Sequence, residues 1–170
     1  MSTYLKLTLI ASFGGLVVGC AEHQHEQHLS SNPHRLKHVR TTAYSRGEDG
    51  GRKNAIGQRL SGNKCKSAAS DWSRFPLGTR FRIVGSNDEY IIDDYGTALI
   101  GTNTIDLYKP SKLEMRRWGV RHVDIDILEW GSEQKSLQVL SPRAKHPTVK
   151  RMIVGLQKKG ANKPQTPAID

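Results

Sequence analysis

The sequence predicts a mainly β domain with one short helix and a C-terminal amphipathic helix. Residues 88–108, DEYIIDDYGTALIGTNTIDLY, combine short apolar runs with Gly96 and Gly101, a pattern typical of short strands separated by tight turns. Residues 122–130 alternate apolar and polar positions, which predicts a half-buried strand. Helix signals stand at residues 111–118 and 147–158.

Two further strands are expected before this region. Residues 39–44, VRTTAY, have the composition of a strand. The turn sequence Pro76-Leu77-Gly78-Thr79 leads into a second apolar run over residues 80–84. We therefore expect most of the β structure to lie between residues 39 and 131.

The two helices have recognisable ends. Ser111 is placed as an N-cap, with Glu114 three residues later as in a capping box and Gly119 as the stop. Pro147 suits the first turn of the second helix. Its apolar positions predict a helix that packs on the β domain with a basic face outward, and they are Val149, Met152, Ile153, Val154 and Leu156.

The chain is basic. Its 170 residues carry 26 Lys and Arg against 16 Asp and Glu, a formal charge of +10. That balance favours an anionic partner. Charge alone does not distinguish a cell-wall polymer, a lipid surface and a nucleic acid. Residues 132–159 form a basic C-terminal extension, and residues 160–170 are expected to be a disordered tail.

The N-terminus indicates export. Residues 7–18 are an apolar run too short to span a membrane and typical of a signal-peptide core. The run ends Val17-Val18-Gly19-Cys20, which resembles a bacterial lipobox, so residues 1–20 are interpreted as a lipoprotein signal with Cys20 as the lipidated residue. An ordinary secretory signal that ends in cysteine is the alternative. With no aspartate directly after Cys20, the resemblance implies an outer-membrane anchor facing the periplasm. Cys65 is expected to be unpaired and buried.

Residues 21–38 are polar and rich in histidine. The spacing of His23, His25 and His28 could hold a metal, but no Cys or Asp joins them and no element fixes them. We therefore interpret residues 21–38 as a tether and expect no metal site.

Three aspartates, Asp71, Asp94 and Asp106, are candidates for chemistry. A strand, a glycine turn and a second strand would bring Asp94 and Asp106 close together. Two carboxylates in one cleft raise the pKa of one of them, which suits a general acid. The alternative is a surface turn with solvated aspartates. Asp93 adjoins this pair, and Asp71 lies upstream beside Trp72, which could stack on a sugar or close the core; the core role is favoured.

The ordered set of motifs resembles a known family. The order is Asp71, Pro76-Leu77-Gly78-Thr79, Asp94-Tyr95-Gly96, Gly101, Ile105-Asp106-Leu107-Tyr108, Trp118-Gly119 and Val123. It resembles the three-aspartate (3D) domain over residues 42–128. The family usually has Asp-Thr-Gly-Gly-Ala-Ile-Lys-Gly where this chain has residues 94–101, so the lysine before the second glycine is missing. The spacing from Asp94 to Asp106 is one residue longer than the common pattern.

The resemblance implies a six-stranded double-psi β-barrel over residues 39–131, similar to the catalytic barrel of membrane-bound lytic transglycosylase A. It implies Asp106 as the acid/base, with Asp94 and Asp71 raising its pKa and binding sugar hydroxyls. The substrate-binding positions it implies are Lys53, Asn54, Tyr95, Gly96 and Gly101; Lys53 could equally be a solvated loop residue.

The function expected is a peptidoglycan lytic transglycosylase that cleaves the β-1,4 bond between N-acetylmuramic acid and N-acetylglucosamine to a 1,6-anhydro product. No metal or organic cofactor is implied, and a monomer is expected. A non-catalytic peptidoglycan-binding lipoprotein is the alternative. A nucleic-acid partner is disfavoured, because an export signal and a lone basic helix do not fit one.

Overall fold

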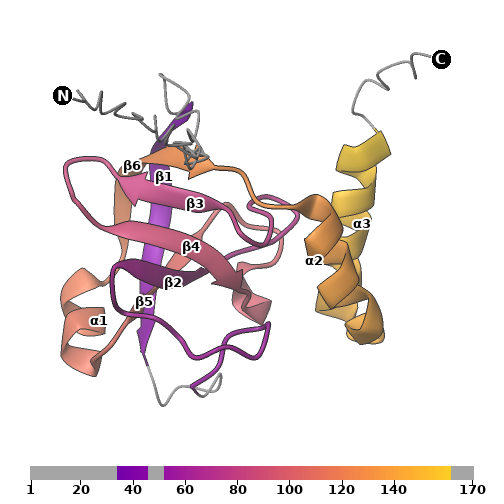
Figure 1. The fold of residues 1–170 in the computed structure, drawn as a ribbon, viewed down its shortest axis with the longest axis horizontal. Coiled ribbons are helices and arrows are strands. Elements are labelled where there is room, and N and C mark those ends of the chain that lie inside the picture. Colours follow the sequence, from indigo (N-terminus) through magenta and orange to yellow (C-terminus); the bar gives the residue numbers. More distant parts are fainter. Residues whose placement is uncertain (1–33, 46–51, 162–170) are drawn as a thin grey trace, which may run out of the picture.

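The computed structural model describes residues 34–45 and 52–161, in which six strands close into a barrel in the order β1-β5-β2-β4-β3-β6 (Figure 1). The pairs β1/β5 and β2/β4 are parallel and the remaining pairs antiparallel, so the barrel is mixed. The predicted six-stranded β-barrel is confirmed. The strands are β1 (His34–Ser45), β2 (Cys65–Ala69), β3 (Arg80–Ile83), β4 (Glu89–Asp94), β5 (Ile105–Lys109) and β6 (Arg121–Glu129).

The first strand begins earlier than the sequence predicted. β1 starts at His34, so residues 34–38 belong to the barrel and not to the tether predicted over residues 21–38. This part of β1 is polar and exposed, which hides the strand pattern; a bulge between Leu36 and Val39 breaks its register with β6. Residues 1–33, including the predicted lipobox, lie outside the described residues, as do residues 162–170 of the predicted tail.

The barrel interior is filled by alternate residues of the strands. Phe81, Tyr90, Ile92 and Ile125 are fully buried there. On β5, Ile105 and Leu107 belong to the same core cluster. Because successive side chains of a strand point to opposite faces, Asp106 between them lies on the outer face of the wall.

The short helix is as predicted. Helix α1 (Lys112–Trp118) has Ser111 as its N-cap, and Ser111 and Glu114 form the reciprocal capping box. Gly119 ends the helix with φ 60°, a conformation that glycine adopts without strain. Cys65, expected to be buried, opens β2 and is half-buried.

The C-terminal extension holds two helices, of which the sequence predicted one. Helix α3 (Pro147–Ala161) buries Val149, Met152 and Leu156 as expected. Helix α2 (Glu133–Leu140) was missed, although Ser132 caps it by accepting from the Lys135 N–H. A 3-10 turn, η2 (Ser141–Arg143), joins them.

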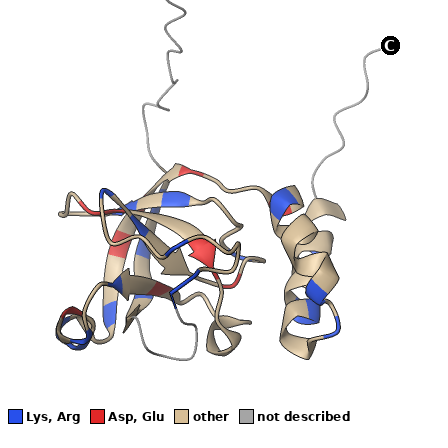
Figure 2. Cartoon of the chain, turned by 60° about the horizontal axis from the view of Figure 1, so that its bottom comes forward, with Lys and Arg blue, Asp and Glu red and all other residues tan. Residues whose placement is uncertain are grey.

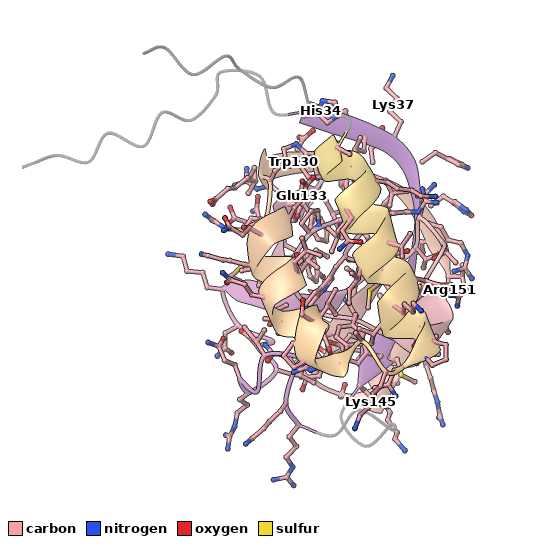
Figure 3. All side chains as sticks on the ribbon, turned by 90° about the vertical axis from the view of Figure 1, so that its right-hand side faces the viewer. His34, Lys37, Trp130, Glu133, Lys145 and Arg151 are labelled. Carbon is pink, nitrogen blue, oxygen red and sulfur yellow. The ribbon has the colours of Figure 1, made fainter. Side chains whose placement is uncertain are left out.

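The helices α2 and α3 lie side by side against one side of the barrel, with Trp130 and Glu133 where α2 begins (Figure 3). Ser136 fixes α2 to the barrel, because its hydroxyl accepts from the Leu77 N–H at 2.9 Å. Basic positions occur on the barrel and on these helices (Figure 2). Within the part of the chain that the structure describes, no helix has the length and apolar character to cross a membrane.

Candidate active site

Two of the predicted aspartates lie in one row across the barrel wall. Ala69 on β2 pairs with Asp94 of β4 on one side and with Asp106 of β5 on the other. Thr42 of β1 continues the row beyond Asp106. Residues in register point to the same face, and neighbouring strands are about 4.8 Å apart, so the two aspartates are about 10 Å apart at Cα. The residue between them, Ala69, carries a single methyl group and is 5% exposed.

A β-bulge sets the direction of these carboxylates. The β2–β4 register passes from Ala68 opposite Ile92 to Ala69 opposite Asp94, so Asp93 is the extra residue. A bulge re-aims the side chains beside it, which is how Asp94 reaches the row of Asp106.

Asp93 itself is held inside the protein. Its side chain is 7% exposed. One carboxylate oxygen accepts from Asn54 Nδ2 at 2.8 Å and from Ser67 Oγ at 2.7 Å. Its other oxygen, Oδ1, is buried and has no hydrogen-bond partner among the residues described. Burial is the main reason that the pKa of Asp93 is raised.

Asp94 is the aspartate with the properties of a proton carrier. Burial, followed by the charge of Asp93, raises the pKa of Asp94 to about 6. The carboxylate accepts from the Tyr95 N–H at 2.9 Å and from the Tyr44 hydroxyl at 3.4 Å. A carboxyl group with this pKa retains a proton in part of the molecules near neutral pH. The sequence predicted that a neighbouring carboxylate raises the pKa in this pair. In the structure, burial is the larger cause of the raised pKa of Asp94.

The outer face of β1 completes the site with two residues that sequence reasoning missed. Thr42 Oγ1 donates to Asp106 Oδ1 at 2.6 Å. Burial and then the charges of Asp94, Asp93 and Asp106 raise the pKa of Tyr44. The Tyr44 hydroxyl thus lies within electrostatic reach of all three carboxylates and stays protonated, so it can only donate to them. Neither residue stands out in the sequence VRTTAY.

Asp71 has a different position from the one expected. It is 2% exposed and lies outside the row. Its Oδ1 accepts from the Ser73 N–H at 2.9 Å and the Ser73 hydroxyl at 2.7 Å, and its Oδ2 accepts from the Gly101 N–H at 2.7 Å. These bonds join the end of β2 to the loop before β5. Asp71 therefore positions the two segments that carry the row.

Trp72 supports the same arrangement from the core. Its side chain is fully buried, which confirms the favoured core role. Its indole N–H donates to the backbone carbonyl of Asp94 at 2.8 Å. The bond fixes the backbone of Asp94, the last residue of β4, whose carboxylate belongs to the row.

The predicted substrate-binding residues fall into different surroundings. Lys53 is exposed and forms an isolated bridge with Arg59. Asn54 is 6% exposed, holds Asp93 and accepts from the Gln58 N–H at 2.8 Å, so it supports the bulge from beneath a loop.

Tyr95, Gly96 and Gly101 lie on the loop between β4 and β5. Gly96 precedes the 3-10 turn η1 (Thr97–Leu99), and Gly101 has φ 87°. The Tyr95 hydroxyl accepts from Arg143 Nη1 at 3.2 Å, while Arg143 Nη2 donates to the Ala55 carbonyl at 2.8 Å. Through Arg143, a residue the sequence did not single out, the C-terminal extension is tied to the rim of the site.

The donor set does not resemble a metal centre. In residues 34–45 and 52–161, no group of three or more His, Cys, Asp or Glu side chains is arranged to hold a metal ion. The chemistry within reach of this site is hydrogen bonding and proton transfer by carboxyl and hydroxyl groups.

Comparison with known proteins agrees with the fold. Residues 66–129 match the family model of the 3D domain, a range that includes Asp71, Asp94 and Asp106 but not β1. Comparison with curated proteins gives no match. The 3D domain family is associated with barrels like those of peptidoglycan lytic transglycosylases. Residues 66–129 thus form a 3D domain, within a closed six-stranded mixed barrel that is consistent with a double-psi β-barrel.

Proposed function

We propose that this protein is a peptidoglycan lytic transglycosylase that cleaves the β-1,4 bond between N-acetylmuramic acid and N-acetylglucosamine. The observation that carries the proposal is the row Asp94–Ala69–Asp106, in which two carboxylates lie on one face of the barrel wall on either side of one small residue. The raised pKa of Asp94, about 6, supplies a proton-carrying group in that row. The 3D domain over residues 66–129 supports the choice of substrate.

The reaction needs one acid that later serves as a base. Asp106, protonated, donates to the glycosidic oxygen as the bond to C1 of the muramyl residue breaks. The resulting carboxylate then takes the proton of the C6 hydroxyl, whose oxygen attacks C1 and forms the 1,6-anhydro ring. Ordinary glycosidases need a second carboxylate as nucleophile or to activate water. Here the nucleophile is already tethered to the reacting sugar, so one carboxyl group suffices.

The neighbouring residues have supporting roles in this proposal. Asp94 supplies a second carboxyl group in the row, and its pKa is raised to about 6. Thr42 Oγ1 donates to Asp106 Oδ1 at 2.6 Å and so helps to fix the orientation of this carboxylate. The Tyr44 hydroxyl donates to Asp94 and stabilises its charged form. Asp71 holds the loops in place.

The proposed location follows from the N-terminus. Cys20 is the lipidated residue, and the barrel is tethered to the outer membrane facing the periplasm, where peptidoglycan is accessible. The formal charge of +10 suits a polymer that carries carboxylates. The protein is proposed to act as a monomer without a cofactor.

Digestion of purified sacculi tests the proposed reaction. The full chain, in detergent, should release muropeptides that end in 1,6-anhydro-N-acetylmuramic acid, identified by mass spectrometry. Release of reducing ends would instead indicate a hydrolase that uses water. Binding to sacculi without any product would leave a peptidoglycan-binding lipoprotein as the function.

A further inference from the structure

A charged pocket lies at the other end of the barrel from the carboxylate row. The row lies at Ala69, the last residue of β2, whereas this pocket includes Lys66 near the start of that strand. On β5 it includes Lys109, the last residue, and it is closed on one side by α1. Its volume is about 270 Å³. The charged residues that line it are Lys66, Asp88, Lys109, Glu114, Arg117 and Arg121.

Lys109 is the central group of this pocket. It is 9% exposed, and its ammonium group donates to the Tyr90 hydroxyl at 2.8 Å. An ammonium group has three donors, and a buried charge is costly unless it is paired. Within the described ranges Lys109 forms no salt bridge. Burial, followed by the charge of Lys66, lowers its pKa.

The two acids of the pocket are already engaged. Asp88 accepts from Lys66 Nζ at 2.7 Å. Glu114 serves the capping box, where its Oε2 accepts from the Ser111 N–H at 3.2 Å and hydroxyl at 2.9 Å. The pocket therefore has four cationic side chains, and three of them are without a carboxylate partner in the described part of the chain: Lys109, Arg117 and Arg121.

Trp118 holds two of these cations in place. The Lys109 ammonium and the Arg121 guanidinium each lie 4.5 Å from the centroid of its ring. Arg121 is fixed further, because Nε donates to the Trp118 carbonyl at 2.9 Å and Nη2 to the Arg117 carbonyl at 2.8 Å. The positive groups are thus pre-organised, which lowers the entropy lost when an anion binds.

We propose that this pocket is a binding site for a compact oxyanion, a carboxylate or a phosphate group. Lysine and arginine donors that converge on one small cavity are the side chains that recognise such groups. A volume of about 270 Å³ accommodates one anionic group with its immediate substituent, not a length of glycan. The site is separate from the carboxylate row and does not depend on the proposed reaction.

Tryptophan fluorescence of the full chain tests this proposal, because Trp118 lies against Lys109 and Arg121. The probes are sodium phosphate and sodium N-acetylglycinate, titrated at constant ionic strength. Saturable change with one or both probes is expected, and the probe that saturates shows whether phosphate or carboxylate is preferred. Trp118→Phe identifies the signal, since it should remove the change while Trp72 and Trp130 remain.

Variants test whether the anion binds in this pocket. Lys109→Met should weaken binding at least about 10-fold, and Arg121→Gln should weaken it as well. Lys158→Met is the matched control, because it removes an exposed charge on α3, and its affinity should equal that of the wild type. Non-saturable change, or equal loss in the control, overturns the proposal. If circular dichroism shows that Lys109→Met does not fold, the test rests on Arg121→Gln, which changes an exposed side chain; wild-type affinity in that variant overturns the proposal.

Discussion

Asp94 and Asp106 pair with the two sides of a single residue, Ala69, although their strands are not neighbours in the barrel. Strand β2 lies between them and presents only a methyl group. This relationship places two carboxyl groups about 10 Å apart at Cα on one face of the barrel wall.

Asp94→Asn should change the pH dependence of stability. The pKa of Asp94, raised to about 6, lies above its ordinary value of 3.8, because burial disfavours the charged form. In the wild type, the stability that protonated Asp94 contributes is fully present below about pH 4 and is lost as the pH rises through 6. Asparagine has no charge to bury. The free energy of unfolding of the variant, relative to that of the wild type, should therefore be about 1–2 kcal/mol greater at pH 7.5 than at pH 4.

Urea unfolding at the two pH values measures this difference. Asp93, whose pKa is also raised, is present in both proteins, so the difference reports Asp94 together with its interaction with Asp93. A stability difference that is the same at both pH values would show that Asp94 is ionised without penalty and is no proton carrier.

Asp71→Ala should destabilise the fold by about 2–4 kcal/mol, because three hydrogen bonds to a buried carboxylate are lost. Urea unfolding should show the loss, and Glu129→Ala, on the exposed end of β6, should change stability by less than about 1 kcal/mol. An Asp71→Ala protein that is as stable as the wild type but inactive would indicate that Asp71 takes part in the reaction.

Gly131→Ala should be among the most damaging small substitutions. An added Cβ would lie 2.4 Å from the backbone oxygens of Pro76 and Leu77, which cannot give way as a flexible side chain can. A loss of about 2–3 kcal/mol is expected in thermal unfolding. Gly160→Ala, where nothing lies within 4 Å, is the matched control and should be neutral or slightly stabilising because alanine favours a helix. Equal effects would contradict the close packing at Gly131.

Cys20→Ser should release the protein from membranes. The proposed anchor is a lipid on this cysteine, so the variant should move to the soluble fraction after cell fractionation while the wild type sediments with membranes. Incorporation of labelled palmitate should be lost in parallel. A variant that still sediments with membranes would show that another part of the chain attaches it.

Local signals allowed part of the fold to be predicted. The Ser111–Glu114 capping box and the alternation along β6 are encoded within a few residues, and both are present in the structure. The order of motifs placed Asp71, Asp94 and Asp106 in the 3D domain.

Other features depend on contacts that sequence patterns do not encode. The row across Ala69 requires β2 to lie between β4 and β5, a crossover that no local pattern determines. The bulge that makes Asp93 the extra residue and buries it is set by Asn54 and Ser67 from distant segments. Helix α2 could have been found from Ser132 at its N-cap followed by Glu133 in the first turn.

The rate at which Asp106→Asn forms 1,6-anhydro ends on purified sacculi tests the central claim most directly. Asp124→Asn is the matched control, because it makes the same change on another barrel strand and keeps an oxygen to accept from the His38 N–H. We predict a loss of about 100-fold or more for Asp106→Asn and wild-type activity for Asp124→Asn, with both variants folded. Full activity of a folded Asp106→Asn protein would contradict the assignment of Asp106 as the acid/base.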